Sequence, residues 1–124
     1  ALAAFVNKEK DAAYKKAKDS ILKIDPKASL ETIKKSTPPV NVSDFVDHID
    51  YIKNQIGIDH VGISSDFDGG GGIEGWRDAS QTYNITLELV RRGYSEQEIG
   101  KIWSGNLLRV LDRTQEVAKE LHGN

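Results

Sequence analysis

The chain has 124 residues, 38% of them hydrophobic, and 17 basic against 19 acidic residues leave a formal net charge of -2. This composition is typical of one soluble globular domain, and it lacks the basic excess of a nucleic-acid-binding protein. No apolar run approaches the roughly 20 residues that span a bilayer. Cysteine is absent, which excludes disulfides and cysteine-ligated zinc but is compatible with a periplasmic, another extracytoplasmic or a cytoplasmic location.

The first 40 residues predict the end of a strand followed by two helices. Residues 1–6 are a short apolar run, typical of the end of a buried strand. A helix is predicted next and ends at Pro26. Its apolar residues recur at helical spacing and are Ala13, Ala17, Ile21 and Ile24. A short helical turn after Ser29 is closed by Pro38 and Pro39.

The clearest helix in the sequence covers residues 42–56. Ser43 or Asp44 can cap its first turn, and Gly57 supplies the left-handed stop. Its apolar stripe has the spacing i, i+4, i+7, i+11 and consists of Phe45, Ile49, Ile52 and Ile56.

A β-strand is predicted at residues 60–66, where the chain reads His-Val-Gly-Ile-Ser-Ser-Asp. Alternation places His60, Gly62, Ser64 and Asp66 on one side, and Val61, Ile63 and Ser65 on the other. The polar side suits the inside of a barrel whose active site lies at the carboxyl ends of its strands. His60 lies roughly 20 Å from Asp66 along a strand, so we expect it to be structural.

Helices are predicted for the rest of the chain, after a glycine-rich loop that runs to residue 78. One helix ends at Gly93, and a capping box of Ser95 with Glu98 opens the next. The side chains expected in the core are Tyr83, Leu87 and Val90 from the first helix and Leu107, Leu111 and Leu121 from the last.

The order of these elements indicates parallel βα units and hence the α/β class, in a chain that is itself largely helical. Two short parallel strands do not make a stable sheet, because parallel strands are normally buried within a larger one. The chain also begins Ala-Leu-Ala and contains no methionine, so its first residue is not a translation start. We therefore expect it to be the C-terminal part of a longer protein.

The loop Asp-Phe-Asp-Gly-Gly-Gly-Gly, which starts at Asp66, is the candidate functional element. An EF-hand calcium loop is excluded, because Gly70 and Arg77 occupy the fifth and twelfth positions, where ligands are required. The first motif of the haloacid dehalogenase phosphatases is similar, with Asp66 as nucleophile and Asp68 as acid/base. Gly70, however, stands in the place of its threonine. A flexible connection with a capping aspartate is the structural alternative.

Four segments together resemble the C-terminal part of the membrane (renal) dipeptidase family of zinc peptidases. They read DHIDYI at 47–52, DHVGISSDFDG at 59–69, RRGYSEQEI at 91–99 and GNLLRVL at 105–111. Their order and spacing match the family over residues 43–112, and the set of four is far more specific than the acidic loop alone.

The resemblance implies a (β/α)8 TIM barrel that hydrolyses dipeptides with two zinc ions at the carboxyl ends of its strands. Such a barrel needs roughly 250 residues, so residues 1–124 would be its last third and part of a single barrel domain. Residues 1–6 would be the seventh strand and residues 60–66 the eighth. Residues 7–40 carry no motif of the family and would be a helical insertion. A homo-oligomer is compatible with this arrangement.

The resemblance assigns both catalysis and contact with the substrate to Asp66. A carboxylate there would accept the proton of a metal-bound water and pass it to the leaving nitrogen. Asp68, Gly69 and Gly70 would shape the loop, with Asp68 accepting bonds from backbone N–H groups.

The zinc ligands of the family have no match in this chain. His48 lies beside the apolar stripe of a helix, His60 at the closed end of the strand and His122 near the C-terminus. Arg91 and Arg92 are interpreted as helix C-terminal charges rather than as the family's substrate-binding arginine. On its own the chain is therefore expected to be inactive. A truncated relative that serves as an interaction module is the non-enzymatic alternative.

Overall fold

The computed structural model describes residues 8–36 and 39–123, and within these ranges the chain is built from helices without a β-strand. The strand predicted at residues 1–6 lies outside the described residues. In chain order the elements are α2 (Lys8–Ile24), α3 (Leu30–Lys35), α4 (Val42–Ile56), η1 (Ile58–His60), η2 (Ala79–Gln81), α5 (Tyr83–Arg91), α6 (Glu96–Gly100), the π-helical turn η3 (Lys101–Gly105) and α7 (Asn106–His122).

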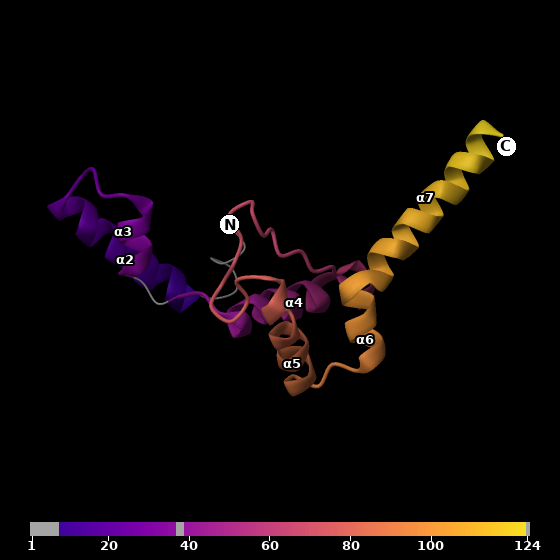
Figure 1. Ribbon diagram of the computed structural model, residues 1–124, viewed down its shortest axis with the longest axis horizontal. Coiled ribbons are helices and arrows are strands. Elements are labelled where there is room, and N and C mark those ends of the chain that lie inside the picture. The colour runs from indigo at the N-terminus through magenta and orange to yellow at the C-terminus, as the bar shows by residue number, and fades with distance from the viewer. Residues whose placement is uncertain (1–7, 37–38, 124) are drawn as a thin grey trace.

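The core lies in the middle of the molecule, among α4, α5, α6 and the long loop between η1 and η2 (Figure 1). Its buried residues are Val46, Ile49, Val61, Trp76, Ile85, Leu89, Tyr94 and Ile102. Because Val61 and Trp76 belong to the loop, the loop is packed into the core rather than laid over it. The largely helical character predicted for the chain is confirmed.

The start of α4 differs from the prediction in its cap. Asn41, not Ser43 or Asp44, is the N-cap, and its side chain accepts a hydrogen bond from the Asp44 backbone N–H at 3.2 Å. The Asp44 carboxylate accepts from the Asn41 backbone N–H at 3.0 Å, so the two residues form a capping box. The predicted stop at Gly57 is confirmed, with φ 89.

The strand predicted at residues 60–66 does not form, and this prediction is wrong for the described chain. A strand depends on hydrogen bonds to a neighbouring strand, and no described segment pairs with these residues in that way. Instead, His60 ends the short helix η1, and the Ile63 N–H donates to the Ile102 carbonyl oxygen of η3 at 3.2 Å.

The alternation predicted for the same segment is confirmed by the exposure of its side chains. The buried or partly buried set is Val61, Ile63 and Ser65, and the exposed set is His60, Gly62, Ser64 and Asp66. The segment therefore has one apolar face against the helices and one polar face that ends in Asp66.

α5 buries a different face from the one predicted. Ile85 and Leu89 are fully buried, whereas Tyr83 is 68% and Val90 55% exposed. Both sets have helical spacing, so the periodicity of the helix permits either. Packing against α4 selects the stripe of Ile85 and Leu89.

α7 begins in the core and then extends away from it (Figure 1). Its first residue, Asn106, is buried, and its first turns contact η3 and the residues in and after η1. The prediction that its leucines reach the core is wrong, because Leu107, Leu111 and Leu121 are each at least half exposed.

α2 and α3 pack against each other at the opposite end of the molecule (Figure 1). Ile33 of α3 is buried there, outside the main core cluster, while Ile24 at the end of α2 is 87% exposed. Both predicted helices of this region are confirmed. Within residues 8–36 and 39–123, no helix has the length and apolar character needed to cross a bilayer.

Candidate functional site

The candidate site is the loop after residue 65, where the backbone is strained at two acidic residues. Asp66 has φ 53 and Asp68 has φ 66, both in the left-handed region. This region costs on the order of 1–2 kcal/mol for a residue with a side chain, although aspartate tolerates it better than most. The turn is held because the Asp66 carbonyl oxygen accepts from the Gly69 N–H at 3.1 Å and the Gly71 N–H at 2.8 Å.

The carboxylates of Asp66 and Asp68 are both exposed. Among the residues that the structure describes, neither takes part in a hydrogen bond or an ion pair, so the backbone bonds expected at the Asp68 carboxylate are not formed. The Asp66 carboxylate lies against Gly69, since a β-carbon at that position would overlap with Asp66 Oδ1. An exposed carboxylate without a partner is available to accept or donate a proton.

Of the glycines in the turn, Gly71 has the least space for a side chain. A β-carbon there would overlap with the Ser65 carbonyl oxygen and lie 2.7 Å from the Asp66 carbonyl carbon. Both are backbone atoms, which cannot move aside as a flexible side chain can. Gly70 was predicted to shape the loop. Its φ of 104 favours glycine, but a β-carbon there would meet no atom within 4 Å.

An aromatic cluster fixes the residue between the two aspartates. The Phe67 ring lies edge-on to Trp76, with 5.4 Å between centroids and 70° between planes. Trp76 is 3% exposed and also meets Phe45 of α4 at 5.1 Å and Trp103 of η3 at 6.4 Å. Its indole N–H donates to Thr82 Oγ1 at 3.1 Å. Such edge contacts contribute about 0.5–1.5 kcal/mol each beyond burial.

Asn106, in the segment GNLLRVL at residues 105–111, anchors the start of residues 60–66, whose polar face ends in Asp66. Asn106 donates through Nδ2 to the carbonyl oxygens of Ile58 and Val61, both at 2.8 Å. The Lys101 ammonium donates to Asp59 Oδ1 at 2.7 Å, and this bond lowers the pKa of Asp59. Sequence reasoning marked Asn106 only as part of a motif, and these contacts are the physical reason for an asparagine there.

A second acidic cluster surrounds Arg92 at the junction of α4 and α5, and sequence reasoning missed it. The guanidinium donates to Asp47 and Asp50 at 2.6 Å each and to Glu88 at 2.9 Å. It also donates to the carbonyl and hydroxyl oxygens of Ser43, both at 2.8 Å. Burial opposes the charge, but the hydrogen bonds to the carboxylates outweigh it and raise the pKa of Arg92. The spacing of Asp47 and Asp50, three residues apart on one helix face, is the signal that could have found the cluster.

Tyr94, Lys53 and Glu98 extend this cluster towards α6. The Tyr94 hydroxyl donates to Asp50 at 2.5 Å, and burial together with this bond raises the pKa of Tyr94. The Lys53 ammonium lies 4.0 Å from the Tyr94 ring centroid and 3.0 Å from Glu98 Oε1. The predicted capping box of Ser95 and Glu98 is confirmed, and hydrogen bonds from the Ser95 backbone and from Lys53 lower the pKa of Glu98 to about 2.

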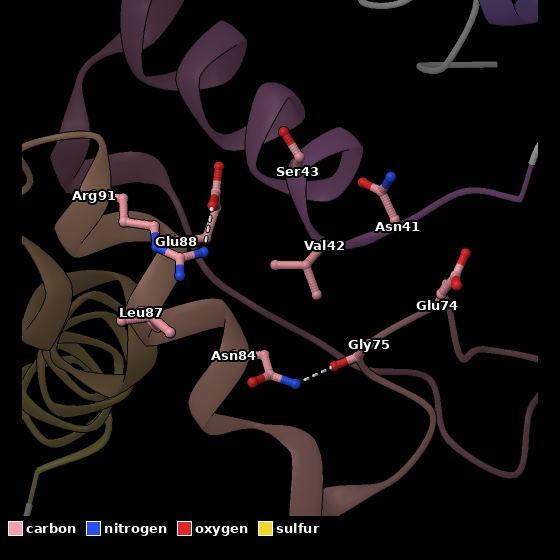
Figure 2. A pocket seen from close by; sticks show the side chains of 9 residues that line it. All are labelled: Asn41, Val42, Ser43, Glu74, Gly75, Asn84, Leu87, Glu88 and Arg91. Atoms are coloured by element: carbon pink, nitrogen blue, oxygen red, sulfur yellow. Dashed lines mark hydrogen bonds and ion pairs between the residues drawn. The ribbon is translucent and has the colours of Figure 1, made fainter.

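A surface hollow of about 410 Å³ lies between the start of α4, the Glu74–Gly75 turn and α5. Figure 2 shows the side chains that line it. Its lining residues are Asn41, Val42, Ser43, Glu74, Gly75, Asn84, Leu87, Glu88 and Arg91. Asn84 donates to the Gly75 carbonyl oxygen at 2.7 Å and so ties α5 to the loop (Figure 2). Asp66 and Asp68 do not line this hollow, so it is separate from the loop carboxylates.

The described residues do not fit a zinc centre on their own. Within residues 8–36 and 39–123, no three histidine, aspartate or glutamate side chains lie together so that they could hold a metal ion. His48, His60 and His122 belong to three separate elements, α4, η1 and α7. Asp66 and Asp68 would provide two ligands, whereas zinc sites use three or four from the protein.

Comparison with known proteins relates the chain to one family. The family model for membrane dipeptidases (peptidase family M19) matches residues 5–124. The chain is 36% identical over 90 residues to the Dipeptidase tcpJ of Claviceps purpurea, which covers 72% of the chain and 21% of that protein. It is 42% identical over 85 residues to the Dipeptidase 3 of Rattus norvegicus, which covers 67% of the chain and 17% of that protein. The chain thus spans about a fifth of the length of the curated relatives it matches.

A solved structure supports the same relation. The crystal structure of the probable dipeptidase PvdM from Pseudomonas aeruginosa shares 51% sequence identity and a TM-score of 0.61 with this chain. The match covers 64% of this chain and 20% of that protein. Most of the chain therefore has the same backbone arrangement as one part of that protein.

Proposed function

The chain belongs to the membrane dipeptidase family, and from this premise we propose that it forms the last part of a dipeptidase in which Asp66 is the catalytic carboxylate. The complete enzyme hydrolyses the peptide bond of dipeptides, and this chain supplies the end of a (β/α)8 barrel. The family assignment favours this function over phosphoryl transfer of the haloacid dehalogenase type.

The observation that carries the proposal is the polar face that ends in Asp66. Val61 and Ile63 already pack towards the helices, while Ser64 and Asp66 face outwards. In a barrel, the same alternation directs one side of a strand to the helices and the other to the interior. Residues 60–66 would become a strand once neighbouring strands pair with their backbone, and Asp66 would then stand at its carboxyl end, where barrel enzymes place catalytic groups.

Asp66 would act by moving one proton. A water oxygen attacks the peptide carbonyl carbon, the carbon–nitrogen bond breaks, and the water proton passes through the Asp66 carboxylate to the leaving amine nitrogen. Transfer by a positioned carboxylate contributes roughly 10²–10⁴ in rate. The same carboxylate would contact the bound dipeptide, because the proton acceptor must lie within hydrogen-bond reach of the reacting atoms.

Two zinc ions, which the family resemblance implies, would need ligands outside the described residues, since no group there fits them. When bound, zinc polarises the carbonyl group and makes water a better nucleophile. Asp66 is the contribution to catalysis that we propose for this chain, and the chain alone is expected to be inactive.

Replacing Asp66 with asparagine tests the proposal. In the complete protein we expect Asp66→Asn to lower kcat by about 10²–10⁴ while the zinc content is retained, because the amide cannot carry the proton. Asp68→Asn is the matched control, two residues away in the same loop, and we expect it to lower kcat by less than about tenfold. Unchanged turnover of Asp66→Asn on a dipeptide substrate would remove this residue from the mechanism.

An interaction module is the alternative, and the apolar side chains that α7 exposes favour it. Metal analysis of the complete protein separates the two functions. About two zinc ions per chain, with dipeptide hydrolysis, support the enzyme, whereas a metal-free protein without hydrolysis supports the module.

A further inference from the structure

Phe67 is the side chain that attaches the turn around Asp66 and Asp68 to the core. Its two neighbours, Asp66 and Asp68, are exposed, whereas Phe67 is partly buried and packs against the core cluster. The backbone is left-handed at both neighbours of Phe67, so the strained turn that carries the Asp66 carboxylate lies directly beside the packed ring. The Phe67 N–H also donates to Ser65 Oγ at 3.3 Å, which closes the turn from the other side.

Trp76 holds that ring and is itself held from several sides. It is buried, it meets Phe45 and Trp103 edge-on, and its indole N–H donates to Thr82 Oγ1 at 3.1 Å. These partners come from α4, η3 and the start of α5. Because three separate elements fix the Trp76 ring, this ring can hold Phe67, and with it Asp66, in a defined position relative to them.

The backbone around Trp76 is fixed as well. The Trp76 N–H donates to the Ile73 carbonyl oxygen at 3.0 Å, and the Ile73 N–H donates to the Trp76 carbonyl oxygen at 3.1 Å. Asn84 of α5 donates to Gly75 within the same tight turn. The end of the loop is thus a rigid support, whereas the residues from Asp68 to Gly72 on its other side are exposed.

We propose that Phe67 and Trp76 are positioning residues for Asp66: their edge-on contact sets the direction of the Asp66 carboxylate. This inference rests on the proposed function, since it assigns these rings to the same reaction. Catalytic geometry is sensitive to such support, because a displacement of about 1 Å at a reacting group can reduce the rate about a hundredfold.

A double-mutant cycle in the complete, zinc-loaded protein tests the inference. Phe67→Ala is measured alone and in the Asp66→Asn background, with kcat as the readout. We expect Phe67→Ala alone to lower kcat about 10–100-fold with the zinc content unchanged. In the Asp66→Asn background we expect no further loss, because there is no longer a proton-carrying group to position.

Two further variants serve as controls for the Phe67–Trp76 contact. Phe67→Tyr keeps the ring and should stay within about threefold of the parent kcat, which would show that the ring is the part of the side chain that is needed. Tyr83→Ala removes a ring that is 68% exposed and lies outside the aromatic cluster, and it should leave kcat unchanged in both backgrounds. If Phe67→Ala does not fold, Trp76→Phe takes its place in the same cycle.

The outcomes are distinguishable. Equal losses from Phe67→Ala with and without Asp66 would overturn positioning and leave Asp66 in its catalytic role. Full kcat in Phe67→Ala would overturn it as well. Full kcat in Asp66→Asn would instead contradict the proposed function itself.

Discussion

Two pairs of aspartates in this protein have opposite surroundings. Asp47 and Asp50 on α4 share the guanidinium of Arg92, and Asp50 also accepts the hydroxyl of Tyr94. Asp66 and Asp68, which are separated by Phe67 in the loop, have no such partner among the described residues. The first pair joins α4 to Arg92 and Tyr94 in the connection between α5 and α6, whereas the carboxylates of the second pair join no described elements.

The backbone separates the pairs in the same way. Asp47 and Asp50 lie inside a regular helix, whereas Asp66 and Asp68 both have left-handed backbone and depend on neighbouring glycines. A protein that needed carboxylates only for stability would have no use for strained and unpartnered ones. The contrast marks the Asp47–Asp50 pair as scaffold, and it supports the catalytic role that we propose for Asp66.

The largest loss of stability is expected from Arg92→Ala, which tests the scaffold half of this comparison. Arg92→Ala leaves three carboxylates, those of Asp47, Asp50 and Glu88, facing one another without the cation that binds them. Removing one partner of a buried pair costs about 3–5 kcal/mol, and the partial exposure of this cluster reduces that to about 2–3 kcal/mol. We expect this loss in the free energy of unfolding, measured by urea denaturation of the complete protein.

Arg91 is the matched control for that substitution. It is the preceding residue, its side chain is 67% exposed, and it lies 3.9 Å from Glu88. We expect Arg91→Ala to change the free energy of unfolding by less than about 0.5 kcal/mol. Equal effects at the two arginines would show that the buried cluster contributes no more than a surface charge.

A smaller loss of stability is expected from Gly71→Ala, which tests the loop half of the comparison. The added methyl group meets the backbone of Ser65 and Asp66, so the turn must open. We expect a loss of about 1–3 kcal/mol in stability, as for other overpacked sites, together with at least a tenfold loss of kcat because Asp66 moves. Urea denaturation and steady-state kinetics of one preparation measure both.

Gly100→Ala controls for the methyl group itself. Nothing lies within 4 Å of a β-carbon at Gly100, which belongs to α6. Alanine favours helix over glycine by up to about 1 kcal/mol, so this variant should be as stable as the parent or more so. Unchanged kcat and stability in Gly71→Ala would mean that the turn is looser than its hydrogen bonds indicate.

Local signals in the sequence were sufficient for the helices and for the position of Asp66. The spacing of apolar residues and the stops at Pro26 and Gly57 placed α2 and α4, because a helix is specified by residues near one another in the chain. The alternation after His60 placed Asp66 on the exposed face for the same reason. These features need no knowledge of distant partners.

What the sequence could not provide depends on contacts between distant segments. Periodicity allowed two stripes on α5, and only packing against α4 distinguishes Leu89 from Val90. The strand at residues 60–66 requires neighbouring strands that the described chain does not provide. Arg92 was read as a helix-end charge because Asp47 and Asp50 lie more than 40 positions away in the sequence. The Phe67–Trp76 contact was missed for another reason, because both residues lie in one irregular loop without a periodicity that relates their side chains.

Glu98 tests the comparison from a third position, because its carboxylate is partly exposed but is held by hydrogen bonds. The Ser95 backbone N–H and the Lys53 ammonium hydrogen-bond to it and lower its pKa from 4.5 to about 2. A lowered pKa means that the carboxylate stabilises the folded state fully above about pH 4.5, and that this contribution is lost as the pH falls towards 2.

Glutamate-selective ¹³C NMR of the complete protein should find Glu98 still ionised at about pH 3.5, where a free glutamate is mostly protonated. Lys53→Met should raise the midpoint only in part, because the bond from Ser95 remains. A midpoint near 4.5 in the parent protein would show that the hydrogen bonds from Ser95 and Lys53 do not stabilise the Glu98 carboxylate.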